Sequence, residues 1–148
     1  MPIPELSPEG FLPAGVFDCT LDDIRQKFGS FQGTDRRPKL FARFEEFVTA
    51  IRRSNLFEAI LIDGSFVTEK AAPNDIDLIA VLHPGHDFER DFSMFEYALL
   101  SRHLLRQRFG FDVVLVERDS ALYDKVVKFF ERVRELTDLR KGLLRLPI

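Results

Sequence analysis

The stretch LIDGSFVTEKAAPNDIDLIAVL, residues 61–82, decides the fold of this chain. It contains several residues with polar or charged side chains between two apolar runs. This pattern predicts a strand, a turn of a size that suits a phosphate, and a second strand. We expect the first strand over Phe57–Asp63 and the second over Asp75–Leu82. The second run is continuously apolar after its acids, as in a strand that is covered on both faces.

The acids Asp75 and Asp77 stand two apart in the second predicted strand. Their side chains should therefore leave the same face, with Cα atoms roughly 6.6 Å apart at about 3.3 Å per residue. Two carboxylates about 4 Å apart repel by roughly 4 kcal/mol at an effective dielectric constant near 20. A divalent cation removes that cost, and Mg²⁺ prefers oxygen ligands, so the pair predicts a magnesium site that Mn²⁺ could also fill.

The turn between the strands carries residues that suit an anion. Gly64 lets the backbone turn sharply or a ligand come close, and Ser65 offers its hydroxyl and its N–H. Lys70, in the same loop, could neutralise a phosphate or be solvated. The plainer alternative is that Gly-Ser is a common loop dipeptide, that 73–75 is an ordinary turn, and that Asp-x-Asp is a solvated strand end.

A third strand is predicted over Phe111–Glu117, with Asp112 near its start. Val114 and Val116 share its face, so an isolated carboxylate there would be poorly solvated and needs a partner or a metal. Asp112 is therefore the candidate third carboxylate, and it could also act as a base. The alternative is that it is a loop residue at the strand's edge.

Gly64-Ser65 followed by the acids of Asn74-Asp75-Ile76-Asp77-Leu78 resembles the signature of the nucleotidyltransferase superfamily, the DNA polymerase beta-like fold. The likeness includes the tail 140–142, would cover most of the chain, and is strongest to small bacterial members of uncharacterised function. It implies that the Gly-Ser turn holds a nucleoside triphosphate. It also implies that Asp75, Asp77 and a third acid bind two Mg²⁺ ions. The chain departs from the family at 68–70, where many members have a second glycine and a longer run to the acids.

The resemblance implies metal-dependent transfer of a nucleoside monophosphate from a triphosphate to a hydroxyl group on protein, RNA or a small molecule. Asp75, Asp77 and Asp112 would be the catalytic and metal-binding residues, with Gly64 and Ser65 holding the nucleotide beside Lys70. The alternative is a catalytically silent binding module, such as a toxin–antitoxin or phage-defence component that acts through a cognate protein or RNA partner. A metal-dependent glycosyltransferase is disfavoured because the chain is short.

Composition limits the remaining possibilities. A chain of 148 residues with 45% hydrophobic content is long enough for one core and too short for two ordinary domains, so we expect one domain over 1–148. The net charge of −3 argues against bulk electrostatic binding of DNA. One cysteine, Cys19, fits a reducing cytoplasm, and no apolar run approaches the roughly 20 residues of a membrane span.

The rest of the chain predicts helices around the strands. Residues 1–18 form an extended Pro/Gly-rich arm, and Thr20 caps a short helix that stops near Gly29. Further helices are predicted over 37–54, 88–108 and 120–136. The order predicts an α+β (mixed α/β) fold, with a small mixed sheet of at least three strands and helices packed on it. Arg140 and Lys141 belong to a basic end, either a solvated helix face or a contact to a phosphate, an acceptor or RNA.

Overall fold

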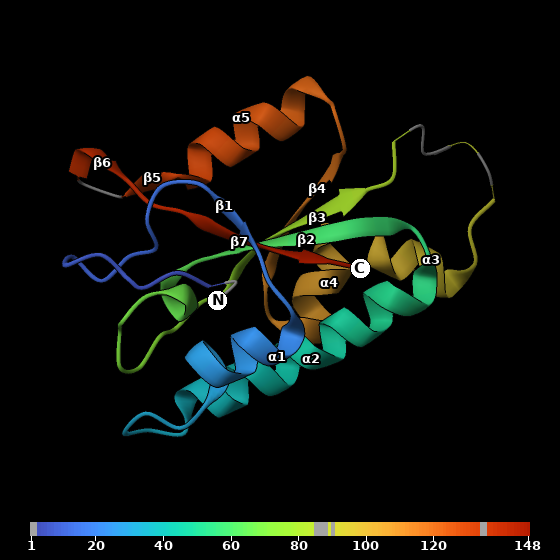
Figure 1. Ribbon diagram of the computed structural model, residues 1–148. Coiled ribbons are helices and arrows are strands. Elements are labelled where there is room, and N and C mark those ends of the chain that lie inside the picture. The colour runs from blue at the N-terminus through green and yellow to red at the C-terminus, as the bar shows by residue number, and fades with distance from the viewer. Residues whose placement is uncertain (1–2, 85–88, 90, 134–135) are drawn as a thin grey trace.

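The computed structural model describes residues 3–84, 89, 91–133 and 136–148 (Figure 1). The strands are β1 (Val16–Asp18), β2 (Phe57–Asp63), β3 (Asp77–Leu82), β4 (Asp112–Glu117), β5 (Arg132–Val133), β6 (Leu136–Arg140) and β7 (Leu143–Pro147). The helices are α1 (Leu21–Ile24) with its π-helical continuation η1 (Arg25–Gly29), α2 (Arg36–Ser54), the 3-10 turn η2 (Ser65–Val67), α3 (Met94–Leu99), α4 (Arg102–Phe109) and α5 (Ala121–Phe130).

Five strands form an open mixed sheet in the order β1-β7-β2-β3-β4. The central strand β2 is antiparallel to both β3 and β7, whereas β4 is parallel to β3 and β1 is parallel to β7. Strands β5 and β6 form a separate two-stranded sheet. The predicted α+β class, with a mixed sheet of at least three strands and helices on it, is confirmed.

Strands β2 and β3 build the centre of the sheet from the two apolar runs. The bounds of β2 match the prediction, but β3 begins at Asp77 rather than at Asp75. The reason is local: the carbonyl of Asp75 accepts a hydrogen bond from Phe66 N at 3.1 Å, and its carboxylate binds Ser65. Residue 75 thus closes the turn instead of extending the ladder between the two strands.

Helix α2 covers one face of the sheet together with α1, α3 and α4 (Figure 1). Its predicted apolar stripe is buried, as period-3.6 patterning requires: Leu40, Phe44, Phe47, Val48 and Ile51. The ring of Phe47 meets that of Phe109 edge-on at 5.3 Å between centroids, which ties α2 to α4. The helix ends where Asn55 adopts a left-handed conformation with φ of 57°.

Helix α5 covers the opposite face (Figure 1). Its apolar side chains pack on alternate residues of the central strands, among them Leu61 and Ile79. The predicted helix over 120–136 was too long, because α5 ends at Phe130. Beyond it the chain forms β5 and then β6, which pair with each other, in place of the end of the predicted helix. Strand β7 follows and pairs with the second edge of β2.

The N-terminal arm is docked on the body. Ile3 and Leu12 are buried in the main core, whereas Val16 is exposed. Its end, Val16–Asp18, forms the edge strand β1 beside β7, which the sequence did not predict. The main-chain N–H of Glu69 donates to Gly10 O at 3.1 Å, so the arm also reaches the turn that follows η2.

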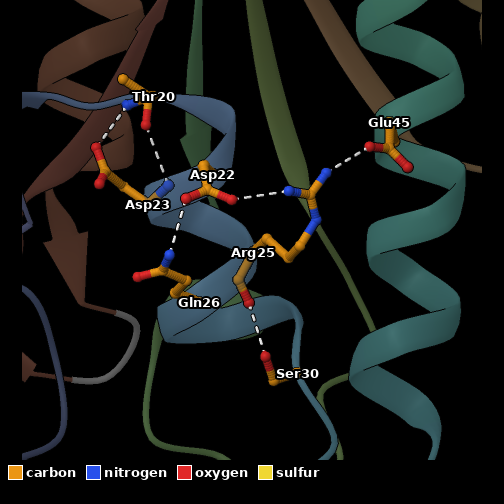
Figure 2. A network of polar contacts seen from close by, with 7 residues as sticks. All are labelled: Thr20, Asp22, Asp23, Arg25, Gln26, Ser30 and Glu45. Atoms are coloured by element: carbon orange, nitrogen blue, oxygen red, sulfur yellow. Dashed lines mark hydrogen bonds and ion pairs between the residues drawn. The ribbon is translucent and has the colours of Figure 1, made fainter.

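Thr20 starts α1 as predicted. Its hydroxyl accepts from Asp23 N, and the Asp23 carboxylate accepts from Thr20 N, which together form a capping box (Figure 2). Arg25 then bridges Asp22 and Glu45 of α2, with N–O distances of 2.8 and 2.7 Å (Figure 2). These ion pairs are exposed and contribute at most about 1 kcal/mol each.

The helix predicted over 88–108 is two helices, α3 and α4, and its expected start at Phe88 lies outside the described residues. Ser101 separates the two because its hydroxyl accepts from Leu104 N and so caps α4. Gly110, with φ of +79°, ends α4. In the part of the chain that the structure describes, no helix is both long and apolar enough to span a membrane.

Candidate active site

Three acids lie side by side at one end of the sheet. The strand register pairs Asp63 of β2 with Asp77 of β3, and Asp77 with Asp112 of β4. Paired residues on neighbouring strands point to the same face, and strands lie about 4.8 Å apart, so the three Cα atoms span about 10 Å. We call Asp63, Asp77 and Asp112 the acid row.

The acid row lies on the face of the sheet that α5 covers. Leu61, Ile79 and Val114 stand two positions along their strands and belong to the apolar cluster beneath α5. Exposure rises along the row: Asp63 is 4% exposed, Asp77 is half-buried and Asp112 is exposed. The row therefore opens to solvent on the side of β4.

Asp75 lies next to this row but is held by the turn. Its Oδ1 accepts hydrogen bonds from Ser65 N at 2.8 Å and from Ser65 Oγ at 2.5 Å. The Ser65 hydroxyl oxygen in turn accepts from Asn74 N and Asp75 N. The two donors that the sequence assigned to a phosphate thus bind an internal carboxylate.

Gly64 is required by the backbone at this turn. Its φ is +92°, a conformation that side chains disfavour. A Cβ at this position would lie 2.9 Å from Asp77 N and 3.0 Å from Asp75 O. The end of β2 can therefore lie against residues 75–77 only because residue 64 is a glycine.

The electrostatics of the site centre on Asp77. Burial and the like charges of Asp75 and Asp63 together raise the pKa of Asp77 to about 6, against the opposing effect of Lys141. Partial burial alone would raise the pKa of Asp75, but the two donors of Ser65 and the charges of Lys70 and Lys141 together lower it below its ordinary value. The carboxylates are thus close enough for each charge to act on its neighbours.

Asp63 and Lys141 belong to the site, and the sequence did not predict either there. Lys141 Nζ lies 2.9 Å from Asp63 Oδ1, an ion pair without an aligned hydrogen bond. Burial raises the pKa of Asp63 in spite of this partner. The interpretation of Lys141 as part of a solvated helix face is therefore wrong, whereas its contact to a phosphate, an acceptor or RNA stays a prediction. Lys141 stands two residues before Leu143, which lies in the cluster under α5, but this relationship becomes visible only once β7 is known.

Asp112 has its own partner on the solvent side. Arg106 NH1 of α4 donates to Asp112 Oδ1 at 2.8 Å, and both side chains are largely exposed. Asp112 lies in register with Asp77, as the prediction of a shared site requires, and its carboxylate forms an ion pair with Arg106.

Lys70 lies in the loop after η2, exposed, and its charge contributes to the lowered pKa of Asp75. The loop is fixed by Arg37 of α2, which is fully buried. Arg37 donates to the carbonyls of Phe28, Phe66, Thr68 and Lys70 at 2.5 to 3.2 Å. Sequence patterning did not identify this residue, because its burial depends on the loop folding back over the start of α2.

The described residues hold no ready-made group of three or more His, Cys, Asp or Glu side chains for a metal ion. The carboxylates are instead engaged one by one, by Ser65, Lys141 and Arg106. Their chemistry nonetheless fits a hard divalent cation, since every candidate ligand is a carboxylate oxygen. Asp63 Oδ1 adds a buried oxygen that lacks an aligned hydrogen bond.

Comparison with known proteins gives a family but no activity. No curated protein and no solved structure matches the chain. A family model matches residues 4–147, nearly the whole chain. The protein therefore belongs to DUF6932, a family of unknown function.

Proposed function

We propose that this protein is a nucleotidyltransferase that transfers a nucleoside monophosphate from a nucleoside triphosphate to a hydroxyl group on protein, RNA or a small molecule. The observation that supports it is the crowding of carboxylates around Asp77, whose pKa burial and like charges raise to about 6. Such crowding is costly for a fold, and perturbed acids of this kind gather at functional sites.

Asp75, Asp77 and Asp112 would hold Mg²⁺, or Mn²⁺ in its place. When bound, the ions would stabilise the attacking and leaving oxygens of the transferred phosphoryl group. Asp112 is the most exposed acid of the row, so it is the carboxylate that an acceptor hydroxyl can reach and to which it can give its proton. The acceptor oxygen then bonds to the α-phosphorus as the bond to pyrophosphate breaks.

Ser65 would donate its N–H and hydroxyl to the β- and γ-phosphate oxygens, and Gly64 would let them come close to the backbone. Lys70 would neutralise part of their charge. Both donors of Ser65 now bind Asp75, so a phosphate can take them only after that carboxylate has moved. A cation that draws Asp75 away would therefore prepare the turn for the nucleotide.

The closed turn also favours the second candidate, a catalytically silent binding module. If Asp75 stays on Ser65, the donors are never offered to a triphosphate. The protein would then act through a protein or RNA partner, as toxin–antitoxin and phage-defence components do. The two candidates differ in one measurable property, which is transfer of label from a triphosphate.

The test uses each of the four α-³²P-labelled nucleoside triphosphates with Mg²⁺ or Mn²⁺, offered to the full chain alone and with total RNA or a cell extract. We expect a labelled product and release of pyrophosphate with at least one nucleotide. Asp77→Asn should abolish labelling, and the matched variant Asp119→Asn, which changes an exposed acid away from the acid row, should not. Labelling that Asp77→Asn leaves intact would exclude the proposed site, and no labelling under any condition would favour the binding module.

A further inference from the structure

The side-chain ammonium group of Lys141 lies among the carboxylates. Its side chain is 17% exposed, and that of its partner Asp63 is 5% exposed. Its positive charge also opposes the raised pKa of Asp77 and contributes to the lowered pKa of Asp75. The ammonium group is thus shared electrostatically by three acids from β2, β3 and the turn before β3.

The backbone at Lys141 is fixed on both sides. Lys141 N donates to Glu131 O at 2.8 Å, and Gly142 N donates to Leu12 O at 3.0 Å. A Cβ at Gly142 would clash with the carbonyls of Pro13 and Gly15. Only the side chain of Lys141 is therefore free to change its position, and its four-carbon stem allows that.

We propose that Lys141 is the resident counter-cation of the acid row, and that a divalent cation binding there displaces its ammonium group from Asp63. The proposal deepens the proposed function, because it rests on the metal site assigned above and adds Asp63, the register partner of Asp77, to its ligands. The presence of the lysine shows that this end of the sheet accommodates positive charge. A dication and an ammonium group cannot both lie within contact distance of Asp63 without strong repulsion.

Displacement has a consequence for the chemistry. Once released, the ammonium group stays tethered at the start of β7, beside the turn that would hold the nucleotide. A free lysine there is a point charge that suits a phosphate. The same residue would thus neutralise the site before the cation arrives and contact the triphosphate afterwards.

The first experiment measures the reactivity of Lys141 in the wild-type chain. Lysines are reductively methylated with isotopically labelled formaldehyde and quantified by peptide mass spectrometry. The reaction is run with and without millimolar MgCl₂ or MnCl₂ at matched ionic strength. We expect modification of Lys141 to increase several-fold with the divalent cation. Lys125, exposed on α5, is the internal control and should not change.

The second experiment measures the melting midpoint against the concentration of MgCl₂ or MnCl₂ for the wild type, Lys141→Met, Lys141→Arg and Lys125→Met. Without metal, Lys141→Met should melt below the wild type, because Asp63 loses its partner. It should also bind the metal at least about tenfold more tightly, since no ammonium group competes. Lys141→Arg and Lys125→Met should retain the affinity of the wild type.

The outcomes separate this inference from the proposed function. If the metal raises the melting midpoint while the reactivity of Lys141 stays constant and Lys141→Met binds no more tightly, the ion pair is merely structural and the metal site stands. If neither the wild type nor Lys141→Met responds to the metal, both the displacement and the metal site are wrong. The reactivity experiment needs no variant, so it tests the displacement of Lys141 even if Lys141→Met does not fold.

Discussion

Ser65 donates both its main-chain N–H and its hydroxyl to the same oxygen, Oδ1 of Asp75, at 2.8 and 2.5 Å. A carboxylate thus occupies the position that a phosphate oxygen would take, and the turn carries its own internal anion. Any anionic ligand of Ser65 has to compete with Asp75, which is covalently part of the loop. Binding of a triphosphate should therefore depend on a cation that attracts Asp75.

We expect the wild type to bind a nonhydrolysable triphosphate detectably with Mg²⁺ and much more weakly without it. Ser65→Ala should weaken the binding measured with Mg²⁺ by about 1 kcal/mol or more, because a charged phosphate oxygen loses a donor. Calorimetric titration with each of the four bases measures both effects. Ser30→Ala, which removes an exposed hydroxyl on the carbonyl of Arg25, is the control and should bind as the wild type does. Equal affinity in the presence and absence of Mg²⁺ would contradict the coupling between Asp75 and Ser65.

Gly64→Ala should destabilise the fold more than the same change at another glycine with positive φ. Gly64 has φ of +92° and would bring a Cβ to 2.9 Å from Asp77 N, whereas Gly33 has φ of +82° and nothing within 4 Å. We expect a loss of about 1 kcal/mol for Gly33→Ala from backbone strain alone, and more than about 2 kcal/mol for Gly64→Ala. Urea unfolding measures both, and equal losses would mean that the contact with 75–77 carries no energy.

Local patterning predicted the elements that local interactions hold. Strand β2 and helix α2 follow from an apolar run and an apolar stripe, and the start of α1 follows from the cap at Thr20. Strands β1 and β7 were missed because they are only 3 and 5 residues long and become strands by pairing with segments far away in the chain.

The residues of the candidate site were likewise predicted only in part. Asp77 and Asp112 were predicted as site residues, and the parallel pairing of their strands puts them in register. Asp63 and Lys141 could not be placed, because their contact requires β7 to lie beside β2, and no local pattern specifies that strand order. Arg37 was missed because buried arginines are rare and its partners are main-chain carbonyls, which every sequence supplies.

Arg37→Met should destabilise the protein strongly. The substitution removes the donor of four carbonyl groups and two cation–π contacts, with Phe28 and Phe66, from a fully buried position. We expect a loss of about 3 kcal/mol or more in the free energy of unfolding, measured by urea denaturation. The neighbouring Arg36→Met removes only an exposed contact to the side chain of Asn74, so it should cost less than about 1 kcal/mol. Similar losses for the two variants would show that Arg37 does not fix the loop.

Asp77 should make stability depend on pH in a defined direction. A carboxyl group whose pKa is raised to about 6 holds its proton more tightly in the folded chain than in the unfolded one, where the pKa is near 3.9. The stabilisation from this proton is complete below about pH 4 and is lost as the pH rises to about 6. The difference between the two pKa values corresponds to about 3 kcal/mol of stability. Because Asp77 is partly exposed, we expect a contribution of about 1 to 2 kcal/mol.

The test compares the free energy of unfolding of the wild type and Asp77→Asn from pH 4 to pH 8 in metal-free buffer. Asn carries no titrating group, so the free energy of unfolding of the variant should rise by about 1 to 2 kcal/mol relative to the wild type across this range. Most of this change should occur between pH 4 and pH 6. Asp119→Asn, at an exposed position whose left-handed backbone suits asparagine, should follow the wild type at every pH. A constant difference in the free energy of unfolding between the wild type and Asp77→Asn from pH 4 to pH 8 would show that the pKa of Asp77 is not raised in the folded chain.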